Sequence, residues 1–290
     1  MRRAARAVAL VAGIGPLAFA SSEPPPEAEI FGSGTVSLPG THETPNGQAA
    51  SSRFSFTRCR ADFTDCEMLE AERVEAAWRV NGRSAFASPP PASGGSPAED
   101  GSIVYYHSTP KLPGDGAASE WKIWEAVRSG AGWSRRRLPA PVNTEARECC
   151  VAALSREVFS FASDRDGVWE IFRAARLAGG WAVEKLPPEI NASRSGQWPS
   201  QVGPGERFLL FSSIREGGPG GDDVYVAFRR SGSWSAPRAL PAPVNSPAFE
   251  DNARVSADGR YLFWSSNRPR RSGDRSANVY RIPIGHLLDP

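Results

Sequence analysis

A pattern of about fifty residues recurs along this chain, and it constrains the fold more than any other feature. Each copy contains a tryptophan, then a proline-rich corner that ends in asparagine, and then an acidic or polar step. The corners end at Asn143, Asn191 and Asn245. The tryptophans that precede these corners are Trp133, Trp181 and Trp234. A chain built from such copies repeats one structural unit several times.

Each copy continues with an aromatic strand and, after a hairpin, a second apolar strand. The aromatic strands cover residues 105–108, 160–163, 210–213 and 263–266. With a degenerate first copy, the copies span about 43–78, 96–133, 148–181, 196–234 and 250–282. A period near fifty residues with about four strands per copy is typical of a β-propeller. We expect an all-β fold, a propeller with five four-stranded blades, or six if residues 78–100 contain an irregular blade.

The stretch from Ser256 to Tyr280 contains Ser-Ala-Asp-Gly-Arg-Tyr, then Ser-Ser-Asn-Arg and Asn-Val-Tyr. It resembles the WD40-like (PD40) repeats of the TolB-type propellers, whose pattern is roughly Ser-x-Asp-Gly-x-x-aromatic-x-Ser-x-Arg followed by aliphatic-Tyr. The stretch from Gly205 to Tyr225 is the next best match. The resemblance covers about residues 43–282 and implies a propeller. It implies no single activity, because such propellers serve as binding platforms and as parts of enzymes.

The N-terminus has the pattern of a secretory leader. Basic residues at 1–6 precede an apolar run at 7–17 that is too short to span a bilayer. An Ala-x-Ala pattern at 18–20 predicts cleavage after Ala20. We expect a signal peptide at 1–20, a flexible tether at 21–29 and a single propeller domain at 30–290. No other run is long and apolar enough for a membrane span, so the sequence predicts a periplasmic or secreted protein.

The last copy ends after its third strand, near Ile282, and lacks an outer strand. Residues 30–38 alternate like a strand and precede the first copy. We therefore expect residues 30–38 to pair with the last blade and close the ring. Such closure would remove exposed sheet edges, which otherwise promote aggregation.

Two stretches depart from the strand pattern. Residues 68–77 have high helix propensity, but their place in the repeat favours two strands joined near Glu72 and Arg73. Residues 87–97 are rich in proline, glycine and serine, and we expect them to form a loop between the first and second copies.

Four cysteines in an exported chain predict disulfide chemistry. Cys59 ends the first aromatic strand and Cys66 begins the next, and neighbouring antiparallel strands bring such residues within bridging distance. We expect a Cys59–Cys66 disulfide. For the adjacent Cys149 and Cys150, a vicinal disulfide, two thiols or a cross-link to another part of the channel remain open. The histidines show no ligand-like spacing, so we expect no metal site.

In a propeller the innermost strands line a central channel, and the loops that enter them form a funnel at one end. Residues five to seven past each corner asparagine mark this mouth. The candidate ligand-binding residues are Glu43, Glu148, Cys149, Cys150, Gln197, Trp198, Glu250, Asp251 and Asn252. They would form a polar pocket for a sugar or peptide, with Trp198 stacking against it.

The alternative interpretation of this set is structural: each glutamate binds the backbone of its own blade. We favour it for the glutamates because they recur with the repeat. Cys149, Cys150, Gln197 and Trp198 depart from the repeat and are therefore the stronger functional candidates.

An arginine follows the aromatic strand in most copies. The set is Arg60, Arg165, Arg215 and Arg268. Converging arginines would clamp a carboxylate, as in sialidases. Because these arginines occupy the same hairpin in each copy, the ring would spread them apart, and we expect them to tie hairpins to neighbouring blades.

The sequence contains no Gly-x-Ser-x-Gly elbow, His-Glu-x-x-His pair or phosphate-binding loop. We favour a monomeric binding or scaffold protein without a cofactor, whose partner is a protein, a peptide or a cell-envelope glycan. The alternative is a carbohydrate-active enzyme of glycosidase or lyase type that uses Glu148, Glu250 or Asp251. Without the leader's arginines the charges nearly balance, which argues against a nucleic-acid partner.

Overall fold

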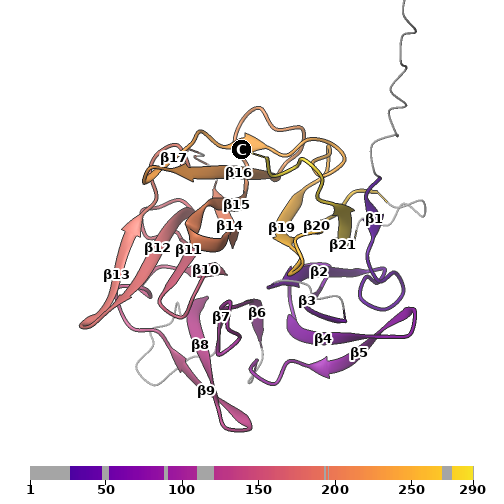
Figure 1. The fold of residues 1–290 in the computed structure, drawn as a ribbon, viewed down its shortest axis with the longest axis horizontal. Coiled ribbons are helices and arrows are strands. Elements are labelled where there is room, and N and C mark those ends of the chain that lie inside the picture. Colours follow the sequence, from indigo (N-terminus) through magenta and orange to yellow (C-terminus); the bar gives the residue numbers. More distant parts are fainter. Residues whose placement is uncertain are drawn as a thin grey trace, which may run out of the picture.

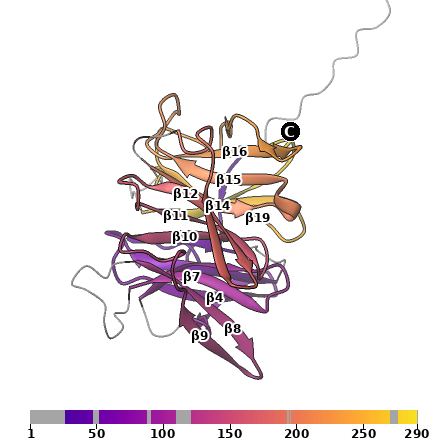
Figure 2. The ribbon, with the colours of Figure 1, turned by 90° about the vertical axis from the view of Figure 1, so that its left-hand side faces the viewer.

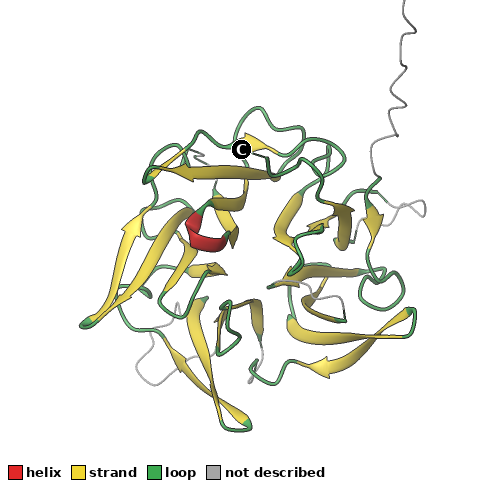
Figure 3. Ribbon diagram, in the orientation of Figure 1, coloured by secondary structure: helices red, strands yellow, loops and turns green. Residues whose placement is uncertain are grey.

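The computed structural model describes residues 27–47, 52–87, 91–109, 121–192, 194, 196–269 and 276–289. Strands in these residues form five antiparallel sheets around a common axis (Figure 1), which confirms the expected five-bladed propeller. The described chain consists almost entirely of strands and loops (Figure 3), with one short 3-10 turn, η1 (Pro204–Glu206). The expected signal peptide at 1–20 and most of the expected tether lie outside the described residues.

The blades follow one another along the chain, and each begins with its innermost strand. Blade 1 contains β2 (Thr41–Asn46), β3 (Arg53–Arg60), β4 (Glu67–Val74) and β5 (Ala77–Arg83). Blade 2 contains β6 (Ala92–Pro97), β7 (Ile103–Ser108), β8 (Lys122–Ser129) and β9 (Gly132–Arg137). Blade 3 contains β10 (Glu148–Ala153), β11 (Val158–Ser163), β12 (Glu170–Leu177) and β13 (Gly180–Lys185). Blade 4 contains β14 (Gln197–Val202), β15 (Phe208–Ser213), β16 (Asp223–Arg230), β17 (Ser233–Trp234) and β18 (Arg238–Ala239). Blade 5 contains β19 (Glu250–Val255), β20 (Tyr261–Ser266), β21 (Asn278–Pro283) and the N-terminal β1 (Glu29–Ile30).

The N-terminal segment closes the ring as expected, although its strand is shorter. Glu29 pairs with Arg281 and Ile30 with Tyr280 in antiparallel register. The amide of Phe31 then donates to the carbonyl of Val279 over 2.8 Å. Beyond this point residues 32–37 form turns rather than a strand, because the amides of residues 35–37 all donate to the carbonyl of Gly32.

Apolar side chains fill the spaces between neighbouring blades. The five buried clusters formed by the described residues correspond to the five interfaces of the ring. Between blades 2 and 3, for example, the rings of Tyr105 and Phe159 lie 4.5 Å apart. The edge-on view shows β7 and β10 at this interface (Figure 2). Burial between sheets therefore holds the blades at a fixed angle, and the funnel residues with them.

The corner asparagines explain why the repeat requires that residue. The side-chain oxygen of Asn143 accepts from the amide of Ile123 at 2.8 Å, and its nitrogen donates to the carbonyl of the same residue at 2.9 Å. Asn191 forms the same pair of bonds with Ile171, and Asn245 with Val224. Each asparagine thus imitates a strand residue and fixes the corner to the third strand of its blade.

Two expectations need correction. Residues 92–97, expected within a loop, form β6, the innermost strand of blade 2. The strand requires small residues because a Cβ atom at Gly94 would lie 2.6 Å from Cε1 of His107, and one at Gly95 would lie 2.8 Å from the sulfur of Met68. The two strands expected in 68–77 exist, but their turn lies at residues 75–76, where Glu75 has a φ of 54°.

The described residues include no helix long and apolar enough to cross a membrane.

Candidate functional site

Backbone hydrogen bonds between blades fix one end of the ring. The first residue of an innermost strand donates its amide to the residue that precedes the third strand of the previous blade. Glu148 bonds to Trp121 at 2.9 Å, and Glu250 to Asp222 at 2.7 Å. The same bond joins Gln197 to Trp169, and in blade 1 the third residue of β2, Glu43, bonds to Ala277 in the same way. These bonds place the entering loops and the hairpins between second and third strands at the same end of the ring.

At this end a cavity of about 980 Å³ lies on the axis, and we call it the funnel. Residues of all five blades line it. The innermost strands contribute Thr44, Gly94, Cys150, Trp198, Asp251 and Arg254 among others. The residues that precede the third strands contribute Cys66, Trp121, Trp169 and Asp222. The funnel expected from the repeat is therefore present.

Aromatic side chains from different blades line the funnel. We call this set the aromatic lining: Phe63, Trp121, Trp169, Trp198 and Phe249. Phe63 is 53% exposed and Trp121 is 40% exposed, so water reaches both. Trp198 packs over Gly196, where a Cβ atom would lie 2.8 Å from the indole. Exposed aromatic faces around a cavity are suited to stacking against a ligand ring.

Bulges direct side chains into the funnel. The register of the innermost strand shifts in blades 2, 3 and 5 at equivalent places. Gly94, Cys150 and Asn252 occupy these bulges with φ values of 65°, 57° and 50°. A positive φ is costly for residues other than glycine, and bulges commonly re-aim side chains at functional sites. Cys150 and Asn252 thus adopt a strained conformation at the cavity wall.

Two buried histidines form part of the wall. His42 packs against the rings of Phe63 and Phe249, at 4.0 and 5.7 Å, and burial lowers its pKa to about 3. His107 accepts a hydrogen bond at Nδ1 from the amide of Cys150, at 3.3 Å, and burial lowers its pKa to about 4. Both imidazoles are therefore neutral near pH 7.

Two carboxyl groups on the wall favour the protonated form. Burial raises the pKa of Asp251 to about 7. Burial, and secondly the proximity of Asp251, raises the pKa of Asp222 well above its ordinary value. One oxygen of each side chain, Oδ1, is buried without a hydrogen-bond partner. These groups can donate a proton or hydrogen bond to a bound molecule.

The predicted mouth residues divide into two groups. Cys150, Trp198, Asp251 and Asn252 line the funnel. The other predicted residues are buried and are not part of the lining: Glu43, Glu148, Cys149, Gln197 and Glu250. In blade 1 the funnel is lined by Thr44, the neighbour of the predicted Glu43.

The glutamates bind their own corners, as the structural interpretation predicted. Glu250 accepts from the amide and hydroxyl of Ser246 at 2.9 and 2.6 Å, and from Arg268 at 3.2 Å. Glu148 makes the corresponding bonds to Thr144 and an ion pair with Lys122. Burial raises the pKa of Glu148, although these donors oppose the shift. The recurring glutamates thus bind their own corners and are not part of the funnel lining.

The recurring arginines also have a structural role. Arg165 donates to the carbonyl of Val142, and its guanidinium lies over the ring of Phe172. Arg215 and Arg268 make equivalent bonds to Ile190 and Val244. Each arginine therefore fixes the corner that enters its blade.

Blade 1 differs from this pattern. Arg58, not the predicted Arg60, donates to the carbonyls of Thr35 and Val36 and to Glu43. Arg60 instead forms an exposed ion pair with Asp65 at 3.9 Å. The difference arises because the N-terminal closing segment takes the place of a corner in this blade.

Cys59 and Cys66 form the expected disulfide. Cys149 is buried and Cys150 is half-buried, and both are free thiols. The described residues contain no group of three or more side chains that could hold a metal ion.

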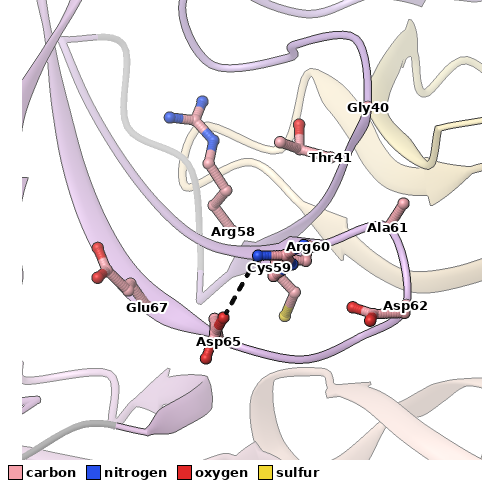
Figure 4. Close-up of a pocket in the computed structure, with 9 residues that line it drawn as sticks. All are labelled: Gly40, Thr41, Arg58, Cys59, Arg60, Ala61, Asp62, Asp65 and Glu67. Atoms are coloured by element: carbon pink, nitrogen blue, oxygen red, sulfur yellow. Dashed lines mark ion pairs between the residues drawn. The ribbon is translucent and has the colours of Figure 1, made fainter.

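A second hollow of about 490 Å³ lies beside the β3–β4 hairpin (Figure 4). Arg60 and Asp65 face one another across it, and both side chains are largely exposed. An ion pair so exposed to water contributes little binding or stability. The funnel, with its buried polar groups and aromatic lining, is therefore the better candidate site.

Sequence reasoning missed His42, Trp121, Trp169, Asp222 and Arg254. A signal for most of them exists in the repeat. Aligned copies place Cys66, Trp121, Trp169, Asp222 and Ala277 immediately before their third strands. This position varies strongly although its neighbours recur, as expected for positions released from a scaffold role.

No family model matches the chain, and the search of curated proteins found no match. Among solved structures it is similar to a glycoside hydrolase, with 10% identity and a TM-score of 0.56 over 85% of this chain and 89% of that chain. A putative TolB from Agrobacterium tumefaciens matches with 13% identity and a TM-score of 0.48 over 79% of this chain and 70% of that one. A puromycin-hydrolyzing peptidase of Mycobacterium tuberculosis matches with 15% identity and a TM-score of 0.45 over 83% of this chain. The match covers only 35% of the peptidase chain. At these identities the likeness shows the propeller fold alone.

Proposed function

We propose that this protein is an exported binding protein that takes a cell-envelope glycan into the funnel. The aromatic lining carries this proposal. Pyranose rings present flat C–H faces that stack on exposed aromatic side chains, whereas their hydroxyl groups need hydrogen-bonding partners. On the same funnel wall, Asp251 and Asn252 offer such partners. A protein or peptide partner needs no such combination of stacking faces beside polar groups.

Two observations support export and the repeat class. The Cys59–Cys66 disulfide is typical of proteins in oxidising compartments, and it agrees with the leader pattern at residues 1–20. The tight turn at Ser256, whose hydroxyl accepts from the amides of Arg260 and Tyr261, gives a structural reason for the Ser-x-Asp-Gly pattern. We therefore assign the repeats to the WD40-like (PD40) class.

Glycan binding is tested with Trp198→Ala. We expect affinity for a bound oligosaccharide to fall roughly fivefold, because a stacked aromatic contributes on the order of 1 kcal/mol. Titration calorimetry with an envelope-glycan panel measures the effect, and Leu177→Ala, at an exposed position on β12, is the control. Wild-type protein that binds no glycan of the panel would contradict the proposal.

A second candidate function is hydrolysis or lyase cleavage of a glycan. The observation that favours it is the pair of wall carboxyl groups, Asp222 and Asp251, whose raised pKa values suit a general acid. Glu148 and Glu250 are less suited, because both bind the scaffold away from the funnel.

In this case Asp251→Asn is expected to lower turnover by roughly 100-fold or more while oligosaccharide binding remains. Release of reducing ends measures turnover, and Asp258→Asn, in an exposed turn, is the control. If the wild type releases no product from glycans that it binds, the enzymatic alternative is excluded.

A further inference from the structure

Arg254, the fifth residue of β19, lines the funnel and departs from the repeat. It is the first residue paired after the bulge of β19, opposite Phe263. The corresponding residues in β6, β10 and β14 are Ser96, Ala152 and Gln201. Four innermost strands thus share this position near the axis (Figure 1), and blade 5 alone among them places a charged side chain there.

The guanidinium of Arg254 reaches from blade 5 to the opposite wall. Nη1 donates to the hydroxyl of Ser96 in blade 2, and Nη2 donates to the carbonyl of Val151 in blade 3, both over 3.3 Å. A guanidinium carries five N–H donors, so these two long bonds leave most of its capacity unused. Nε is buried without any partner, and the whole residue is 3% exposed although it lines the funnel.

The charge of Arg254 has no counterion among the residues that the structure describes. The half-buried arginines of the ring are better served: Arg58, Arg165 and Arg268 each pair with a glutamate. Arg215 has no ion pair among the described residues, but it donates to the carbonyls of Glu189 and Ile190. No carboxylate of the described residues lies within ion-pair distance of Arg254, and this includes Asp222 and Asp251 on the funnel wall. A buried cation without a partner costs stability. Such a cost is consistent with a group kept for a ligand.

We propose that Arg254 binds the carboxylate of an acidic sugar, a hexuronate, at the base of the funnel. This inference rests on the proposed glycan-binding function and narrows its ligand class. A carboxylate and the planar guanidinium form two parallel charge-assisted hydrogen bonds. The carboxylate is then the counterion of Arg254, and its oxygens accept from the unused N–H donors. The sugar ring above the carboxylate then lies among the aromatic lining.

Glucuronate and its neutral counterpart glucose test the proposal, with binding followed by calorimetry and by the rise in melting temperature. Wild-type protein is expected to bind glucuronate more tightly than glucose. Arg254→Met is expected to weaken glucuronate binding roughly tenfold or more and to leave glucose binding unchanged. Arg254→Gln, which keeps a polar side chain without the charge, covers the case in which the methionine variant does not fold. Arg260→Met, at an exposed turn of the same blade, removes the same charge outside the funnel and is expected to bind like the wild type.

A second measurement separates a binding role from a structural one. Without ligand, Arg254→Met is expected to melt at the same temperature as the wild type or higher, because it removes an unpaired buried charge. A lower melting temperature for both Arg254→Met and Arg254→Gln would overturn the proposal, as would equal glucuronate binding by wild type and variants. Glucose binding as tight as glucuronate binding, or no glucuronate binding, also overturns it. The oligosaccharide panel with Trp198→Ala still decides the glycan-binding function independently.

Discussion

Phe31→Ala is expected to lower the free energy of unfolding by about 3–5 kcal/mol, the usual cost of removing a buried phenylalanine side chain. Phe31 is 3% exposed, and its ring lies 4.7 Å from Phe54, 5.0 Å from Trp78 and 5.0 Å from Phe263. It therefore joins the closing segment to blade 1 and blade 5 at once. Urea unfolding monitored by tryptophan fluorescence measures the loss.

Phe159→Ala is the matched control, because Phe159 is equally buried but lies between blades 2 and 3. Hydrogen exchange distinguishes the two variants. Phe31→Ala is expected to increase exchange most at Val279, whose amide donates to the hydroxyl of Ser37, and at Glu43, whose amide donates to Ala277 across the closure. If exchange rises equally in all blades, Phe31 stabilises the whole ring and not the closure in particular.

His42→Phe is expected to make the protein more resistant to acid. Burial lowers the pKa of His42 from 6.5 to about 3. Between these values the unfolded chain binds a proton at this residue and the folded chain does not. The free energy of unfolding therefore falls as the pH falls through this window, by roughly 1.4 kcal/mol per pH unit for this group. The phenylalanine variant does not lose this stability on acidification, and its ring can pack against Phe63 and Phe249 as His42 does.

The difference between wild type and variant is the quantity to measure, because other groups titrate in both proteins. Asp251 has the opposite sign: its raised pKa stabilises the folded state at low pH, and this contribution is lost as the pH rises through about 7. Urea unfolding at pH 7.0, 5.5 and 4.5 should give a gap that widens on acidification, by about 1.4 kcal/mol per unit below pH 6.5. A constant gap would show that His42 takes up a proton in the folded protein. His286→Phe, at an exposed C-terminal position, is the control.

The ring was predictable because its determinants recur. The corner asparagines, the arginines of blades 3 to 5 and the glutamates each make the same contacts in several blades, so each pattern is visible more than once in the sequence. β6 was not predictable, because Ala-Ser-Gly-Gly-Ser-Pro has little strand propensity. It is a strand because it pairs with β7. Its residues are small because His107 and Met68 leave no room for larger side chains at Gly94 and Gly95.

The site was predictable only in part. The spacing from the corners located the mouth, and Cys150, Trp198, Asp251 and Asn252 do line it. The spacing could not separate residues that face the funnel from residues one position away, because alternate strand residues point to opposite sides. Arg254 occurs once and reaches blades 2 and 3, so its surroundings depend on the closed ring and not on its own copy.

The closing contact between Glu29 and Arg281 joins residues 252 positions apart. During synthesis from the N-terminus, β1 has no partner until β21 emerges, so the last pairing to become available is also the one that completes the ring. Such long-range pairing makes folding slow. Until then Phe31 can pack only against Phe54 and Trp78 of blade 1, and the face that meets Phe263 stays uncovered. Exposed apolar surface and unpaired strand edges in such an incomplete ring favour self-association.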